Sequence, residues 1–136
     1  MPVAILRGLD SGVTLHKLTE HYDEGDIILQ REIPLAPEEN LVTLMEKIHQ
    51  VSVSLLDLFL DDPDRLWNQA VVQDSGEYWE EPSDEDRTIH SVDSVERAAR
   101  VLRAFYGYGI LCQIHGVTIE VQEARFYHLG EALPET

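Results

Sequence analysis

Two strand-like runs joined by a glycine-containing turn occupy the first quarter of the chain. The runs 13–18 and 27–35 are rich in β-branched and large apolar residues, and the second alternates in character along its length. Asp23 and Gly25 stand between them, and glycine lets a backbone turn tightly beside another group. The pattern predicts a hairpin-like pair of strands with a carboxylate on a turn held by scaffold on both sides, a common position for a catalytic acid or base.

A long amphipathic helix is predicted to follow these strands. The apolar residues recur mostly at intervals of three and four, at Leu41, Leu44, Met45, Ile48, Val51, Leu55, Leu56 and Phe59. Residues 37–40 supply a start signal, and Pro63 ends the helix because proline cannot continue it. Residues 2–9, opened by Pro2, are compatible with a short helix.

The next segment is polar and acidic as far as residue 88. Within it we expect a short strand over 69–73 and a linker over 74–87. A second helix is predicted from about residue 95 to Phe105, with Asp93 and Glu96 resembling a capping pair. Strands are predicted over 110–114 and 117–121, joined by a tight two-residue turn at 115–116, with a third over 124–128.

Composition narrows the classes of partner. The net charge is −16, from 26 acidic residues against 10 Lys and Arg. Because binding to a phosphate backbone needs clustered basic residues, this balance argues against nucleic acid. No apolar run is long enough to span a membrane and no leader is apparent, so the cytoplasm is the default location. The single cysteine, Cys112, and the spacing of the histidines give no reason to expect a metal site.

The turn and its flanking strands carry a resemblance to a known family. The sequences GVTLH at residues 12–16 and DEGDIILQ at residues 23–30 resemble the segment that carries the catalytic aspartate of folate-dependent formyltransferases of the methionyl-tRNA formyltransferase type. The likeness extends more weakly through a linker at 78–86 and an Arg-Ala-Phe helix end at 103–105. It implies an α/β (α+β) fold: residues 1–66 as the C-terminal part of the catalytic domain, a linker over 67–88, and a small β-rich, OB-like or barrel-like domain over 89–136.

The resemblance also implies a reaction and its residues. Members of the family transfer a formyl group from 10-formyltetrahydrofolate to an amine, using an asparagine and a histidine from an Asn-x-His segment together with an aspartate. Asp23 matches that aspartate, which is thought to set the protonation of the family histidine. His16 matches the histidine after Gly-Val-Thr. It could orient Asp23 or the acceptor, or it could be a satisfied strand histidine.

The other two catalytic residues have no counterpart in this chain. Its only asparagines, Asn40 and Asn68, are not followed by histidine two positions later. We therefore expect the polypeptide to be inactive alone, with no folate bound, and to be either a fragment of a longer enzyme or a short relative. The expected partners are an N-terminal formyltransferase half or a second copy, and a small amine or amino sugar rather than tRNA. The alternative is a non-catalytic dimerisation or partner-docking module.

Aromatic residues cluster around the expected linker and the end of the second helix. They are Tyr78, Trp79, Phe105, Tyr106 and Tyr108. Such a cluster could form a stacking surface, but packing between the two parts of the chain is the more common use.

Overall fold

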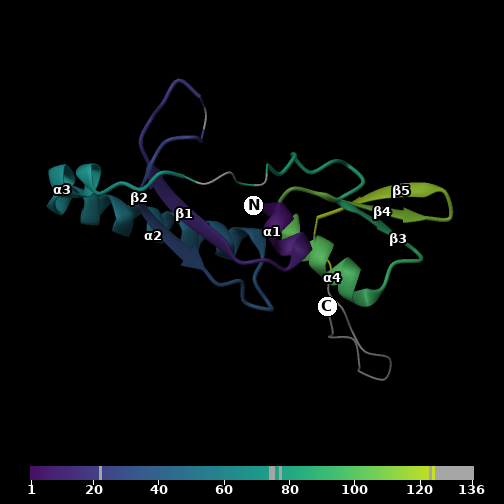
Figure 1. Cartoon of the computed structure of the whole chain (residues 1–136). Helices are drawn as coiled ribbons and strands as arrows, with labels where there is room; N and C mark the ends of the chain where they lie inside the picture. Colours follow the sequence, from purple (N-terminus) through teal and green to yellow (C-terminus); the bar gives the residue numbers. More distant parts are fainter. Residues whose placement is uncertain (22, 74–75, 77, 123, 125–136) are drawn as a thin grey trace.

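The computed structural model of the chain describes residues 1–21, 23–73, 76, 78–122 and 124. Its first part is a two-stranded antiparallel sheet of β1 (Ser11–His16) and β2 (Ile27–Ile33), preceded by the short helix α1 (Pro2–Arg7). The loop between the strands projects away from the sheet (Figure 1). The predicted pair of strands is confirmed, and Asp23 lies on the loop that joins it.

Helix α2 (Leu41–Asp61) has the extent that the apolar periodicity predicts. The side chain of Asn40 caps its start, accepting hydrogen bonds from the backbone N–H groups of Val42 and Thr43 at 2.9 and 3.1 Å. The helix packs against both strands of the β1–β2 sheet and runs along it (Figure 1). The apolar stripe of α2 therefore covers one face of the sheet.

A further short helix, α3 (Pro63–Asn68), follows α2 directly and was missed from the sequence. Pro63 was treated only as the end of α2, yet proline is also favoured in the first turn of a helix, where its missing N–H is not needed. The side chain of Asp62 caps α3 by accepting from the N–H of Arg65 at 3.3 Å. The expected strand over 69–73 is reduced to one bridge, in which Val71 pairs with Ile27.

A three-stranded sheet and one helix form the second part. Its order is β3-β4-β5, with β3 (Thr88–His90) parallel to β4 (Ile110–Ile114) and β4 antiparallel to β5 (Val117–Val121). β3 was not predicted, because its partner is some twenty residues away in sequence and no local pattern reports such pairing. The strand expected over 124–128 lies outside the described residues apart from Ala124. The OB-like or barrel-like form expected of this part stays a prediction.

Helix α4 (Val95–Ala104) lies between the parallel strands β3 and β4 in sequence. Its cap differs from the predicted one: Ser94, not Asp93, accepts from the N–H of Arg97, at 3.2 Å. Asp93 instead accepts from the backbone N–H of His90 at 2.8 Å and pairs with Arg97. The acid that was expected to cap the helix closes the turn that leads into it.

One cluster of buried side chains draws on both parts of the chain. Its members come from α1, β2, α2, β4 and the end of α4: Ile5, Ile33, Leu41, Leu44, Val101, Ala104, Phe105 and Ile110. Leu44 on α2 and Val101 on α4 have no exposed surface. Arg100 adds a polar tie between helices by donating to the carbonyl oxygen of Leu6 at 3.2 Å. The two sheets are therefore joined through a common hydrophobic core (Figure 1).

Candidate active site

The described part of the β1–β2 loop brings His16 and Asp23 together. Nε2 of His16, at the end of β1, lies 3.6 Å from Oδ1 of Asp23. The two groups form an ion pair when the imidazole is protonated, although the separation is too long for a hydrogen bond. The side chain of His16 is 26% exposed and that of Asp23 is 92% exposed. The histidine is thus held by the sheet, whereas the carboxylate faces outward beside it.

The backbone at Asp23 has an unusual conformation. Its φ is 57°, in the left-handed region that residues other than glycine adopt at a cost of about 1–2 kcal/mol. Aspartate tolerates this region better than most residues, and such conformations are concentrated at functional sites. The turn therefore places the Asp23 side chain in a direction that an ordinary extended backbone would not give.

The second nitrogen of His16 determines which tautomer the ring adopts. Nδ1 lies 2.9 Å from the carbonyl oxygen of Lys17, and a carbonyl oxygen can only accept. Nδ1 must therefore carry the proton in the neutral ring, which leaves Nε2 as the proton acceptor on the side of Asp23. A proton taken up at Nε2 of His16 would lie beside the Asp23 carboxylate, which would offset its charge as an ion pair.

The two ends of the loop are closed by a charged pair that sequence reasoning missed. Nζ of Lys17 lies 3.1 Å from Oδ2 of Asp26, and the N–H of Lys17 donates to the carbonyl oxygen of Asp26 at 3.0 Å. Asp26 is therefore part of this closure through both its side chain and its backbone. The signal was present, since a Lys and an Asp of opposite charge flank the turn at the point where two antiparallel strands must meet.

Gly25 is buried at the same neck. A Cβ there would overlap the carbonyl oxygen of Lys17 and would lie 3.3 Å from Nδ1 of His16. Only a glycine lets the two backbones approach this closely, so the glycine that suggested the turn is needed for a close approach rather than for a positive φ.

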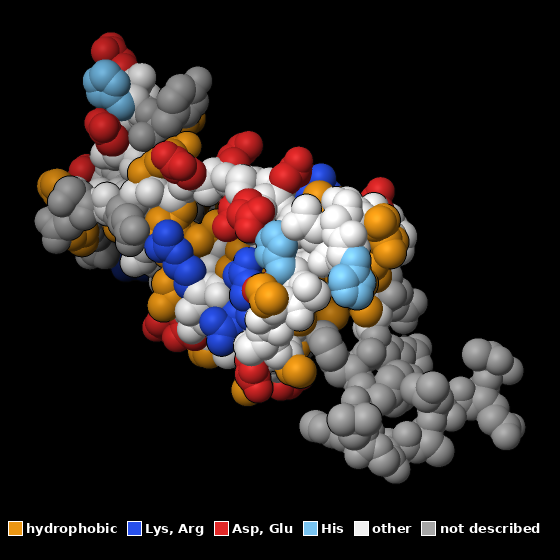
Figure 2. All heavy atoms as spheres, turned by 90° about the vertical axis from the view of Figure 1, so that its right-hand side faces the viewer, with side chains coloured by type: hydrophobic (Ala, Val, Ile, Leu, Met, Phe, Trp, Pro, Cys, Tyr) orange, Lys and Arg blue, Asp and Glu red, His pale blue; other side chains and the backbone are white. Residues whose placement is uncertain are grey.

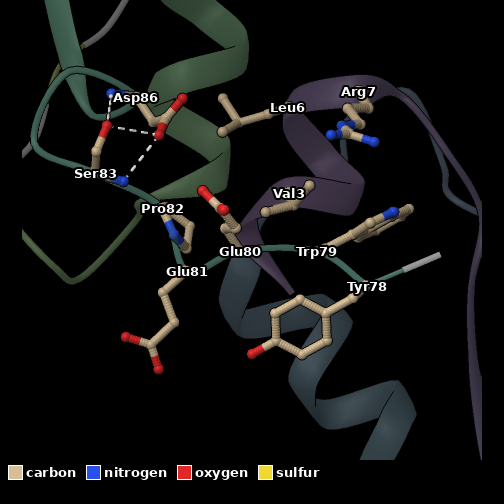
Figure 3. Close-up of a pocket in the computed structure, with 10 residues that line it drawn as sticks. All are labelled: Val3, Leu6, Arg7, Tyr78, Trp79, Glu80, Glu81, Pro82, Ser83 and Asp86. Atoms are coloured by element: carbon tan, nitrogen blue, oxygen red, sulfur yellow. Dashed lines mark hydrogen bonds between the residues drawn. The ribbon is translucent and has the colours of Figure 1, made fainter.

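A groove of about 470 Å³ lies beside α1 and is separate from this pair. Val3 and Leu6 of α1 line it, and the guanidinium of Arg7 lies over the ring of Trp79, with its carbon Cζ 5.0 Å from the ring centroid (Figure 3). The remaining lining comes from residues 78–86. Of the predicted aromatic cluster, Tyr78 and Trp79 line this groove, whereas Phe105 is buried in the core.

One acid of the groove has a shifted pKa. Oδ2 of Asp86 accepts from both the backbone N–H and the hydroxyl of Ser83, each at 2.8 Å (Figure 3). These hydrogen bonds, the backbone one first, hold the pKa of Asp86 below its ordinary value because they stabilise the charged form. Asp86 therefore closes a local turn within the segment that was expected to be a linker.

Other sites can be assessed from the described residues. They contain no group of three or more His, Cys, Asp or Glu side chains arranged to hold a metal ion. None of the helices in this part of the chain is both long enough and apolar enough to span a bilayer.

Comparison with known proteins gives consistent matches. The formyl transferase family model matches residues 3–59. The methionyl-tRNA formyltransferase of Ehrlichia ruminantium (strain Gardel) is 30% identical over 126 residues, which are 92% of this chain and 41% of that protein. That of Anaplasma marginale (strain St. Maries) is 31% identical over 133 residues, 97% of this chain and 43% of that protein. The chain thus spans about two fifths of the length of these curated relatives.

Solved structures of low sequence identity have the same fold. A 4-N formyltransferase from Francisella tularensis aligns with a TM-score of 0.69 at 23% identity, over 93% of this chain and 56% of that one. The N-formyltransferase from Helicobacter canadensis, in complex with folinic acid and dTDP-3-aminofucose, aligns with a TM-score of 0.65 at 22% identity, over 96% and 52%. HypX from Aquifex aeolicus, in complex with tetrahydrofolic acid, aligns with a TM-score of 0.74 at 21% identity, over 86% and 21%.

The matched segment contains the His16–Asp23 pair. The segment that matches the family model contains β1, β2, the loop with Asp23 and nearly all of α2, so the His16–Asp23 pair lies inside it. The chain belongs to the formyl transferase family, of whose members it spans a part.

Proposed function

We propose that this chain is the portion of a formyltransferase that supplies a proton-handling pair, His16 and Asp23, to the transfer of a formyl group from 10-formyltetrahydrofolate to an amine. The observation that supports the proposal is the pair itself. Nε2 of its imidazole is an acceptor that faces a carboxylate, and both residues lie within the segment that matches the family model.

The chemistry of formyl transfer requires such groups. An amine that attacks a carbonyl carbon gains a positive charge and must lose a proton before the product is released. When bound, the folate donor supplies the formyl group, and the residues of this chain handle the proton. Asp23 accepts the proton through a carboxylate oxygen and becomes neutral. When Nε2 of His16 accepts the proton instead, the Asp23 carboxylate 3.6 Å away offsets the charge of the imidazolium. Proton transfer by a positioned side chain typically contributes about 10²–10⁴-fold in rate.

We propose that the remaining catalytic groups are supplied by another polypeptide segment. The sequence has no Asn-x-His segment to stabilise the developing oxyanion, and removal of such donors costs about 10²–10³-fold each. The chain is therefore inactive alone and pairs with an N-terminal formyltransferase half in the cytoplasm. In this proposal, residues 1–66 of the chain complete the catalytic domain, residues 67–88 form a linker, and residues 89–136 form a small β-rich, barrel-like domain.

A chimaera provides the test. The chain replaces the matched 126 residues of the Ehrlichia ruminantium (strain Gardel) enzyme, and consumption of 10-formyltetrahydrofolate is followed with a series of amine acceptors. We expect turnover, and we expect Asp23→Asn to lower kcat by about 10²-fold or more. Glu24→Gln, which removes a neighbouring exposed acid on the same loop, is the matched control and should leave kcat unchanged. Equal activity of Asp23→Asn and Glu24→Gln would refute the role of Asp23.

The acceptor in this proposal is a small amine or an amino sugar rather than tRNA. The net charge is −16, and the face shown in Figure 2 carries scattered acidic side chains with only a small group of Lys and Arg among them. Among the basic residues of α4, Arg97 is paired with Asp93 and Arg100 with the carbonyl of Leu6. A gel-shift titration at low salt tests this, because micromolar binding of tRNA would refute it.

A second candidate function is supported by exposed apolar side chains. On α2, the side chains of Val53, Leu56 and Leu60 are at least half exposed. On β5, Val117 is more than half exposed and Ile119 is nearly half exposed. Exposed apolar surface of this kind suits a non-catalytic module that dimerises or docks on a partner. Light scattering over a range of concentrations separates the two functions, since a strict monomer at high concentration would argue against the docking module.

A further inference from the structure

We propose that Lys17 is a positioning residue, which fixes the ring of His16 against Asp23 by tying the β1–β2 loop to α3. The inference rests on the proposed function for its catalytic meaning. Its geometry, however, is independent of activity, and can be measured on the chain alone. The backbone of Lys17 contacts the histidine, and its side chain reaches Trp67 on α3.

The backbone of Lys17 joins three parts of the site. Its N–H donates to the carbonyl oxygen of Asp26 at 3.0 Å, which closes the loop. Its carbonyl oxygen accepts from Nδ1 of His16 at 2.9 Å, which sets the tautomer that leaves Nε2 facing Asp23. Gly25 packs directly on that carbonyl, because a Cβ there would overlap it. The orientation of the imidazole therefore depends on where this one peptide group is held.

The side chain of Lys17 holds the peptide group in place. Nζ lies 3.1 Å from Oδ2 of Asp26 and 5.1 Å from the centroid of the Trp67 ring on α3. The lysine side chain is only 22% exposed, so its charge is partly withdrawn from water and depends on these two partners. One ammonium group thus connects Asp26, the residue before β2, with Trp67 on α3.

The chain after α3 reinforces the connection. Ile27, the first residue of β2, exchanges two backbone hydrogen bonds with Val71, at 2.8 and 2.9 Å. Residues 63–71 therefore lie along the neck of the loop, with Trp67 against Lys17 and Val71 against Ile27. The segment that was expected to begin the linker therefore packs against the base of the loop. Lys17 contacts both this segment and the imidazole of His16.

The test measures the His16 tautomer by nitrogen-15 NMR at a pH where the imidazole is neutral. In the wild-type chain we expect the Nδ1–H form to predominate. Lys17→Met keeps the aliphatic stem and removes the charge, and it should lower the ratio of the Nδ1–H to the Nε2–H form by about fivefold, the effect of losing one hydrogen bond of typical strength. Lys17→Arg, which retains both the ion pair and the contact with the ring, should keep the tautomer ratio of the wild-type chain.

A matched control separates positioning from general stability. Lys47→Met removes another lysine that is paired with a carboxylate, that of Glu39, at a site remote from the loop. It should leave the tautomer ratio unchanged even where it lowers the melting temperature. A ratio that Lys17→Met leaves unchanged, or that Lys47→Met changes equally, would overturn the proposal.

Two further results keep the inference distinct from the proposed function. If Lys17→Met does not fold, Trp67→Leu removes only the ring contact and should change the same ratio in the same direction; no change would count against the proposal. In the chimaera, Lys17→Met should lower kcat about fivefold with KM unchanged, in line with the loss of one hydrogen bond. If Asp23→Asn proves fully active, the proposed function fails, while the tautomer ratio still decides whether Lys17 positions the ring.

Discussion

Replacing Leu44 by alanine should destabilise both sheets together. Leu44 lies on α2 with no exposed surface and belongs to the cluster that also contains Val101 of α4. The change removes three carbons, worth about 2.4 kcal/mol at about 0.8 kcal/mol each. The cavity left behind raises the loss to about 3–4 kcal/mol. Val101→Ala removes two carbons from the same cluster and should cost about 2–3 kcal/mol by the same reasoning.

Urea denaturation followed by two probes measures the effect. Tryptophan fluorescence reports on Trp67 and Trp79, and hydrogen exchange of the β4–β5 amides reports on the second sheet. Both should shift together, because a shared core makes unfolding cooperative. Leu56→Ala, on the same helix but with a side chain that is 50% exposed, is the control and should cost about 1 kcal/mol or less. If Leu44→Ala moved the fluorescence transition while the β4–β5 amides kept wild-type protection, the reasoning from a common core would be refuted.

Two other predictions concern a turn and a buried acid. His115 and Gly116 both have positive φ, 49° and 80°, and Asn-Gly is the preferred pair for such a turn. Calorimetry of His115→Asn should therefore show a free energy of unfolding that is higher by about 0.5–1 kcal/mol. No gain in stability would contradict this reasoning. Glu39 is 4% exposed, and although burial raises its pKa, hydrogen bonds and charge from Lys47 outweigh this and hold the pKa below 4.5. Its contribution to stability is therefore fully present above pH 4.5 and is lost as the pH falls through the lower folded value. Glu39→Gln should show a flatter acid dependence of unfolding in urea, and an identical dependence would refute the pairing.

Local patterns were sufficient for the elements that are fixed by neighbouring residues. The cap at Asn40, the apolar period that follows it and the stop at Pro63 define α2, and the structure agrees with all three. The two-residue turn at 115–116 likewise sets the register of β4 and β5, because positive φ at both positions matches the twist of the strands. Asp23 and His16 were selected from a motif, and the structure places them 3.6 Å apart. Their catalytic roles stay a prediction, as does the division at residues 66 and 88.

The features that were missed depend on contacts between residues distant in sequence. β3 is a strand only because β4 lies beside it, and α3 matters to the site because it brings Trp67 onto Lys17. Ser94 displaced Asp93 as the cap of α4 because Asp93 was already engaged with the backbone N–H of His90.

The sequence by itself determined the long helix, both hairpins, the family and the acid on the turn, since each depends on residue spacing, backbone preference or a motif within some twenty residues. The tertiary structure alone decided that the two sheets share one core, that the histidine ring presents Nε2 to the carboxylate, and that Lys17 contacts both Asp26 and Trp67. The physical reason is that burial and side-chain pairing depend on which surfaces meet, and a local pattern shows that a surface needs a partner without specifying which one.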